Sequence, residues 1–142
     1  MNWEDCIRNN KVKEVGRNPD MAKSLFTLAK RRMESINRRK DDEFPQLLLE
    51  DYYEVIKELL TALLALRGYK SYSHECLISF LEKHYEGLLP YSEIHLINEL
   101  RMLRSDILYR GRDIAEDYLV RNIESIDMII ERLTYKVEKE LE

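Results

Sequence analysis

The chain has 142 residues, of which 44% are apolar and 35% are charged, and its formal net charge is −4. This length suits one domain with one hydrophobic core, and the composition excludes an intrinsically disordered chain. No apolar stretch approaches the ~18–20 residues that span a bilayer. The acidic first residues, MNWED, contain no apolar signal core. We therefore expect neither a membrane segment nor export.

The glycines and prolines divide the chain into long segments without helix breakers, in which apolar residues recur every three or four positions. This spacing predicts an all-α, up-down bundle of four to five helices, preceded by a weakly ordered or short helical segment at residues 1–17. The predicted helices are 3–9, 19–39, 44–67, 71 or 73–85, 92–111 and 113–142. The segment 44–67 is apolar on nearly every side, which is typical of a central, buried helix. No alternating strand pattern or hairpin turn is found.

Charge is unevenly distributed along this predicted bundle. Residues 20–40 carry seven bases against two acids, a net charge of +5, whereas residues 41–142 carry −10. The basic helix end is a candidate for phosphate binding. The alternatives are a solvated helix terminus, or a pairing with the acidic residues 138–142.

The two cysteines, Cys6 and Cys76, are too few for a disulfide framework and too far apart for a zinc knuckle. We expect them to stay reduced in a cytoplasmic protein.

The histidines do not form a metal-binding pattern. His74 is followed by Glu75 and Cys76, but consecutive helical residues point about 100° apart, and His84 and His95 lack partners at ligand spacing. No glycine-rich phosphate loop occurs. We expect no metal and no cofactor.

His74 lies at the predicted start of a helix, where free backbone N–H groups favour anions. The alternative is a polar contact that fixes the turn.

The densest polar segment, residues 100–113, contains four arginines, two aspartates and one tyrosine. Arg101 and Arg104 share one helix face, and guanidinium groups bind phosphate well. Arg104 and Tyr109 are five residues apart, so they serve one site only if the helix end loosens or a second subunit contributes. The alternative is a network of arginines with Asp106 that locks the following turn. The candidate ligand-binding residues are Arg104, Tyr109, Arg101, Arg110, Asp106 and His74.

Six tyrosines in the middle of the chain suit either a dimer interface or a half-buried core. They are Tyr52, Tyr53, Tyr69, Tyr72, Tyr85 and Tyr91.

Three blocks in order resemble the HEPN family, the higher eukaryote and prokaryote nucleotide-binding domains, and most of all its small stand-alone prokaryotic and archaeal members. They are residues 51–69 (DYYEVIKELLTALLALRGY), 72–77 (YSHECL) and 103–111 (LRSDILYRG). The resemblance covers about residues 20–135. It implies a helical bundle, a homodimer and a minimal nucleotidyltransferase as partner, as in toxin–antitoxin pairs.

Many members of this family are metal-independent RNases, with a signature of an arginine, four to six variable residues and a histidine. Arg104 matches the arginine, and Tyr109 stands where the family has histidine. A tyrosine, with a pKa near 10, cannot replace an imidazole in proton transfer near pH 7. The resemblance therefore favours a non-catalytic module that binds nucleotide, RNA or a nucleotidyltransferase.

Two alternatives remain open from the sequence. One is a metal-independent endoribonuclease, in which Arg104 stabilises the transition state and Tyr109 or His74 handles protons. The other is a purely structural, dimeric interaction protein.

Overall fold

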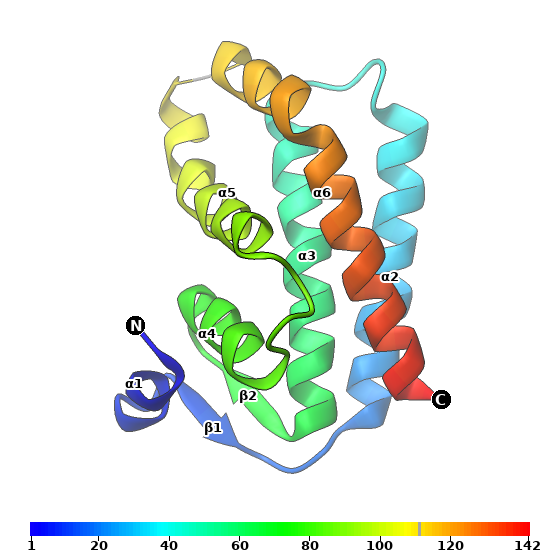
Figure 1. The fold of residues 1–142 in the computed structure, drawn as a ribbon. Coiled ribbons are helices and arrows are strands. Elements are labelled where there is room, and N and C mark those ends of the chain that lie inside the picture. Colours follow the sequence, from blue (N-terminus) through cyan, green and yellow to red (C-terminus); the bar gives the residue numbers. More distant parts are fainter. Residues whose placement is uncertain (111) are drawn as a thin grey trace.

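The computed structural model describes the backbone of residues 1–110 and 112–142, and the side chains of residues 1–104 and 114–142. Within these residues, six helices and one two-stranded sheet follow each other along the chain (Figure 1). The elements are α1 (Trp3–Arg8), β1 (Val12–Glu14), α2 (Pro19–Arg39), α3 (Pro45–Arg67), β2 (Tyr69–Ser71), α4 (His74–His84), α5 (Tyr91–Arg110) and α6 (Arg112–Leu141).

The all-α prediction is confirmed at the level of fold class, and α3 is the central helix. In Figure 1, α2 lies on one side of α3, α4 and α5 lie on the other, and α6 crosses in front; each of these four helices contacts α3. Most of α3 is buried, from Leu48 to Leu66. Burial of such a continuous apolar surface is the main driving force for assembly. Among the described residues, no helix combines the length and apolar character that crossing a bilayer requires.

Helix ends follow local chemistry. The side-chain oxygen of Asn18 accepts a hydrogen bond from the backbone N–H of Met21 at 3.0 Å, so the predicted cap of α2 is present. Gly68 ends α3 in the left-handed region, with φ of 87°. A Cβ atom there would lie 3.2 Å from the backbone of Gly16, so both the conformation and the close approach favour glycine.

The expectation of a chain without strands is wrong at two short segments. β1 and β2 pair antiparallel, with Val12 opposite Ser71 and Glu14 opposite Tyr69. Each strand has only three residues. The pairing joins distant parts of the chain. The sequence therefore contains no run of alternating apolar and polar residues and no hairpin turn from which the pairing could be predicted. The sheet holds α1 beside α4 (Figure 1).

The expectation of reduced cysteines is also wrong. Cys6 and Cys76 form a disulfide across 70 residues, with their Cα atoms 6.0 Å apart. The short helix predicted near the N-terminus is present as α1, and its Trp3 is only 5% exposed, in edge contact with Tyr69 and Phe80. Residues 1–17 are thus fixed by a covalent bond, a strand and an aromatic cluster.

Two arginines of α2 form ion pairs with carboxylates of α3 and of the loop before it. Arg32 donates two hydrogen bonds of 3.0 Å to the buried carboxylate of Glu58, and Arg39 pairs with Asp51 at 2.7 Å and with Glu43 at 2.7 Å. These residues join α2 to α3 and to the loop before it. Part of the basic patch therefore has a structural role, with partners on α3 rather than at the C-terminus.

The tyrosines divide between core and surface. Tyr52, Tyr53 and Tyr85 are buried, and Tyr69 is half-buried in the aromatic cluster with Trp3. Tyr72 and Tyr91, in contrast, are exposed. Four of the six tyrosines therefore belong to the core or its edge.

Reduction of the disulfide is expected to destabilise the fold. A cross-link closing a loop of this length restricts the unfolded chain, and its loss costs about 2–4 kcal/mol. Urea unfolding with and without dithiothreitol should show this difference in the free energy of unfolding. A double Cys6→Ser, Cys76→Ser variant should be insensitive to the reductant. Two thiols that titrate freely in the folded, untreated protein would contradict the bond.

Candidate functional site

Three of the candidate residues from the sequence meet beside α3. Arg101 and Arg104 lie on α5, and His74 is the first residue of α4. Arg104 and His74 contact the buried side chain of Tyr53 in α3, and the charge of Arg101 acts on the pKa of the same tyrosine. Tyr109, Arg110 and Asp106 fall in the segment 105–113, outside the residues whose side chains the structure describes.

Arg104 is held in place by two groups of α3. Its guanidinium carbon lies 4.7 Å from the centroid of the Tyr53 ring, and its Nη2 lies 3.6 Å from Oε1 of Glu54. The Arg104 side chain keeps 28% of its surface exposed. A planar guanidinium on an aromatic face loses little further freedom when it binds a ligand. Arg104 is therefore oriented and reachable from solvent.

His74 is positioned by the same tyrosine. The hydroxyl of Tyr53 lies 3.2 Å from Nδ1 of His74, and the two ring centroids are 5.9 Å apart. When the hydroxyl donates to Nδ1, the neutral imidazole carries its proton on Nε2. The turn before His74 is fixed separately, because the Ser71 hydroxyl donates to the carbonyl of Ser73 at 2.7 Å. Both the Ser71 hydroxyl and the contact of His74 with Tyr53 therefore lie at this turn, and the structural role of His74 that the sequence left open stays an alternative to anion binding.

We call the group Tyr53, Glu54, Lys57, His74, Arg101 and Arg104 the arginine–tyrosine cluster. Its cations outnumber its single carboxylate: Lys57 pairs with Glu54 at 2.8 Å, and the same Glu54 faces Arg104. Arg101 is steered by Asn98, whose side-chain oxygen accepts hydrogen bonds from Nε at 3.1 Å and Nη2 at 3.0 Å. The cluster is a local positive site on a protein of negative net charge.

Burial and charge shift both titratable rings of the cluster. Desolvation lowers the pKa of His74 below its ordinary value of 6.5, and Lys57 and Arg104 lower it further, with Glu54 opposing them. Burial raises the pKa of Tyr53, although Arg104 and Arg101 oppose this shift. Near neutral pH, His74 is therefore an uncharged imidazole and Tyr53 keeps its hydroxyl proton.

The sequence interpretation missed Tyr53, Glu54, Lys57 and Asn98. Glu54 and Lys57 carried a signal, because they are charged residues within the largely apolar stretch of α3. A charge on such a helix needs a partner from a neighbouring element. Tyr53 gave no separate signal, because a buried aromatic residue in an apolar helix is ordinary core.

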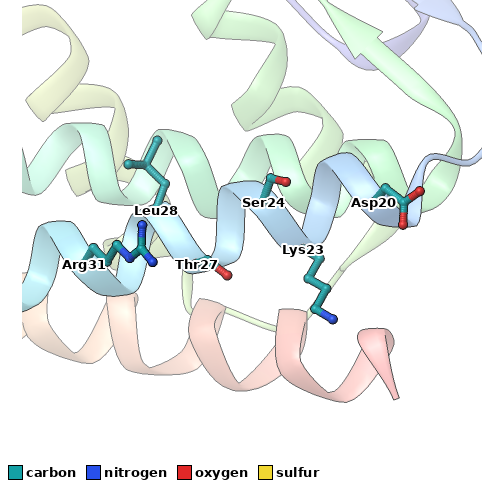
Figure 2. A pocket seen from close by; sticks show the side chains of 6 residues that line it. All are labelled: Asp20, Lys23, Ser24, Thr27, Leu28 and Arg31. Carbon is teal, nitrogen blue, oxygen red and sulfur yellow. The ribbon is translucent and has the colours of Figure 1, made fainter.

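A hollow on the surface of α2 is the main alternative position for a ligand-binding site. It encloses about 470 Å³ and is lined by Asp20, Lys23, Ser24, Thr27, Leu28 and Arg31. Figure 2 shows these side chains spread along one helix, with Ser24 and Leu28 on one side and Lys23 and Thr27 on the other. Within the part of the chain that the structure describes, only α2 lines this surface, so it offers a ligand fewer convergent groups than the arginine–tyrosine cluster does. Among the described residues, no group of three or more His, Cys, Asp or Glu could hold a metal ion.

The geometry predicts a measurable titration of His74. Proton NMR should give a pKa below 6.5, and Arg104→Ala should raise it, because removal of a nearby cation favours the protonated ring. His84 is the internal control: burial, Arg67 and Lys83 lower its pKa, so Arg104→Ala should leave it unchanged. A His74 pKa that does not respond to Arg104→Ala would place the ring away from the cations.

Comparison with known proteins adds no further constraint on this site. No protein-family model, curated protein or solved structure matches the chain. The similarity to the HEPN family therefore stays a prediction from the three sequence blocks.

Proposed function

We propose that the protein is a non-catalytic binding module that holds a phosphate group of a nucleotide or RNA at the arginine–tyrosine cluster. One observation carries the proposal: the guanidinium of Arg104 lies 4.7 Å above the ring of Tyr53, in a cluster that also contains Arg101, Lys57 and His74.

Several features of the cluster suit a phosphate. Arginine presents parallel N–H donors that match two phosphate oxygens, and the stacking on Tyr53 orients them in advance. His74 can add an Nε2–H donor from α4 when the Tyr53 hydroxyl occupies Nδ1. Donors from two helices thus converge on one side of α3. The overall charge of −4 disfavours nonspecific binding to polyanions, so a local site explains anion recognition better than a general basic surface does.

The wider HEPN-like role is part of the same proposal. It includes a homodimer and a minimal nucleotidyltransferase as partner, because the resemblance implies both. The cytoplasmic location expected from the sequence also stays a prediction. The Cys6–Cys76 disulfide weighs against it, since such bonds persist mainly in oxidising compartments.

Removal of the Arg104 guanidinium should weaken phosphate binding. Loss of a charge-assisted hydrogen-bond donor costs about 1.5–3 kcal/mol, or about tenfold to a hundredfold in affinity. Calorimetric titration with AMP at low salt should therefore show this loss for Arg104→Ala. The AMP affinity of Arg104→Lys should lie between those of the unaltered protein and Arg104→Ala, because lysine keeps the charge but lacks the planar pair of N–H donors.

The matched control is Arg31→Ala, which removes an exposed arginine from the α2 hollow. It should bind AMP like the unaltered protein. Equal losses in the two variants would mean a diffuse electrostatic effect and would contradict the proposed site. Circular dichroism melting of each variant separates lost binding from lost folding.

A specific observation supports metal-independent RNA cleavage as a second function. His74 provides an imidazole with a lowered pKa beside Arg104, so a proton acceptor exists in the cluster even though Tyr109 replaces the family histidine. In this scheme His74 would accept the proton of the ribose 2′-hydroxyl as its oxygen attacks the adjacent phosphorus. The P–O5′ bond would break, the leaving 5′-oxygen would take a proton from water, and Arg104 would stabilise the negative charge that develops on the phosphate.

The two functions are separated by an RNA cleavage assay in the presence of EDTA. A binding module should release no cleavage product above buffer background. Cleavage that both His74→Gln and Arg104→Ala abolish, but Arg31→Ala preserves, would replace the first function with the second. Residual cleavage that is identical in all variants would indicate a contaminating nuclease.

A further inference from the structure

Helices α2 and α6 together form one side of the bundle, because they contact each other and both pack on α3 (Figure 1). A hollow of about 220 Å³ opens between them, lined by Ala29, Lys30, Met33 and Glu34 of α2, Val55 of α3 and Thr134 of α6. We call the exposed residues of the two helices on either side of this hollow the α2–α6 face. The face includes the charged residues Lys23, Lys30 and Arg38 of α2 and Glu124, Glu131 and Glu138 of α6.

The α2 side of this face is basic. Lys30 lines the hollow and so marks the side of α2 that is turned towards α6. Lys23 precedes it by seven residues and Arg38 follows it by eight, which places both within about 80° of Lys30 around the helix. All three are exposed, and within the described residues none of them forms an ion pair, although Lys30 lies over the ring of Phe26. Glu34 at the hollow offsets one charge and leaves an excess of positive charge.

The α6 side of the face is acidic. Glu124, Glu131 and Glu138 recur every seven residues, so they form one stripe that drifts by only about 20° per repeat. Glu131 and Glu138 are the helical neighbours of Thr134, so the stripe runs beside the hollow. The three carboxylates are exposed and have no ion-pair partner in the part of the chain that the structure describes. Val120, which is 74% exposed, continues the stripe by one turn.

Opposite charges lie at similar levels along the two helices, because α2 and α6 run antiparallel. Lys30 lies near the level of Thr134, and Lys40, ten residues later on α2, acts on the pKa of Asp127, seven residues earlier on α6. Each base of the α2 side is therefore within about one helical turn, about 5 Å, of the level of an acid on α6. Lysine and arginine side chains can span that difference.

A second copy of the chain supplies a surface complementary to this face. When two copies meet about a two-fold axis that runs along the helices, α2 of each copy lies on α6 of the other, and opposite charges meet at both contacts. The contact is isologous, so it closes as a dimer. A two-fold axis across the helices would instead place the two basic sides together, so charge favours the first arrangement. A face two helices wide and about 30 Å long buries about 600 Å² per copy, near the lower end of specific interfaces.

We infer that the α2–α6 face is a dimer interface, at which α2 of each copy pairs with α6 of the other. This inference rests on the homodimer that forms part of the proposed function and specifies its interface. It uses none of the residues of the arginine–tyrosine cluster.

Sedimentation velocity measures the dimer and its dependence on charge. Dimerisation of the unaltered protein should weaken at least about tenfold in 1 M NaCl, where the Debye length falls to about 3 Å. Simultaneous reversal of the α2 bases, in a Lys23→Glu, Lys30→Glu, Arg38→Glu variant, should make the protein monomeric at concentrations where the unaltered protein is a dimer, because like charges then meet at both contacts.

The reciprocal variant reverses the acids of α6, with Glu124→Lys, Glu131→Lys and Glu138→Lys, and should also be monomeric. An equimolar mixture of the two variants should form a heterodimer, because both contacts then pair opposite charges again. Circular dichroism of each variant checks that it is folded. Restoration on mixing is an outcome that misfolding of either variant cannot produce.

The matched control is Lys11→Glu, Lys13→Glu, Lys70→Glu, which changes the net charge by the same amount as the α2 variant, at exposed lysines of the strand-pair region. It should dimerise like the unaltered protein. A monomer at all concentrations, a dimer that survives both reversals, or two folded variants that do not associate on mixing would each overturn the interface.

The phosphate site is tested separately by calorimetric titration with AMP, because the arginine–tyrosine cluster is built from α3, α4 and α5. A dimer of the inferred kind that does not bind AMP would support the interface and overturn the phosphate site alone. Arg104-dependent AMP binding by a protein that is always monomeric would overturn the interface alone.

Discussion

The packing of the bundle depends on one interaction: carboxylates of the central helix α3 pair with arginines of the helices beside it. Removal of one partner from a buried ion pair leaves an uncompensated charge and costs several kcal/mol. Three carboxylates of α3 each have an arginine from an adjoining helix. The pairs are Asp51–Arg39, Glu58–Arg32 and Glu54–Arg104. The same requirement that joins α2 to α3 thus brings an arginine of α5 against Tyr53.

The three ion pairs differ in how closely the arginine is bonded to its carboxylate. Arg32 makes two hydrogen bonds of 3.0 Å to Glu58, whose side chain is only 6% exposed. Arg104 lies 3.6 Å from Glu54, and Glu54 also pairs with Lys57 at 2.8 Å. The Arg104 contact is longer and its carboxylate is shared and more exposed, at 21% against 6% for Glu58, whereas the two arginine side chains are equally exposed at 28%. Arg32 is therefore bonded to α3 more completely than Arg104, the arginine that we propose to bind phosphate.

The parts of this structure that follow local rules could be predicted from the sequence. Asn18 and Gly68 mark real helix ends, and the apolar run of α3 correctly identifies the central element. Long-range features could not be predicted, because their cause is spatial. The strand pair and the Cys6–Cys76 bond join segments that only the packed bundle brings together. Arg101, Arg104 and His74 were selected by residue type and helix position. Their convergence depends on Tyr53, which looks like ordinary core in the sequence.

The N-terminal segment links these long-range features to the candidate site. Cys76 lies two residues after His74, and its disulfide ties the first turn of α4 to α1. β2 holds the preceding segment through its pairing with β1, and the Tyr53 hydroxyl meets the His74 ring from α3. Fixing the backbone of a residue before a ligand arrives removes an entropic cost from binding. A covalent bond, a strand pair and a buried tyrosine therefore all orient an exposed imidazole. Such restraint of the α4 start is consistent with the phosphate site that we propose, because a ligand would then meet an imidazole whose backbone is already ordered.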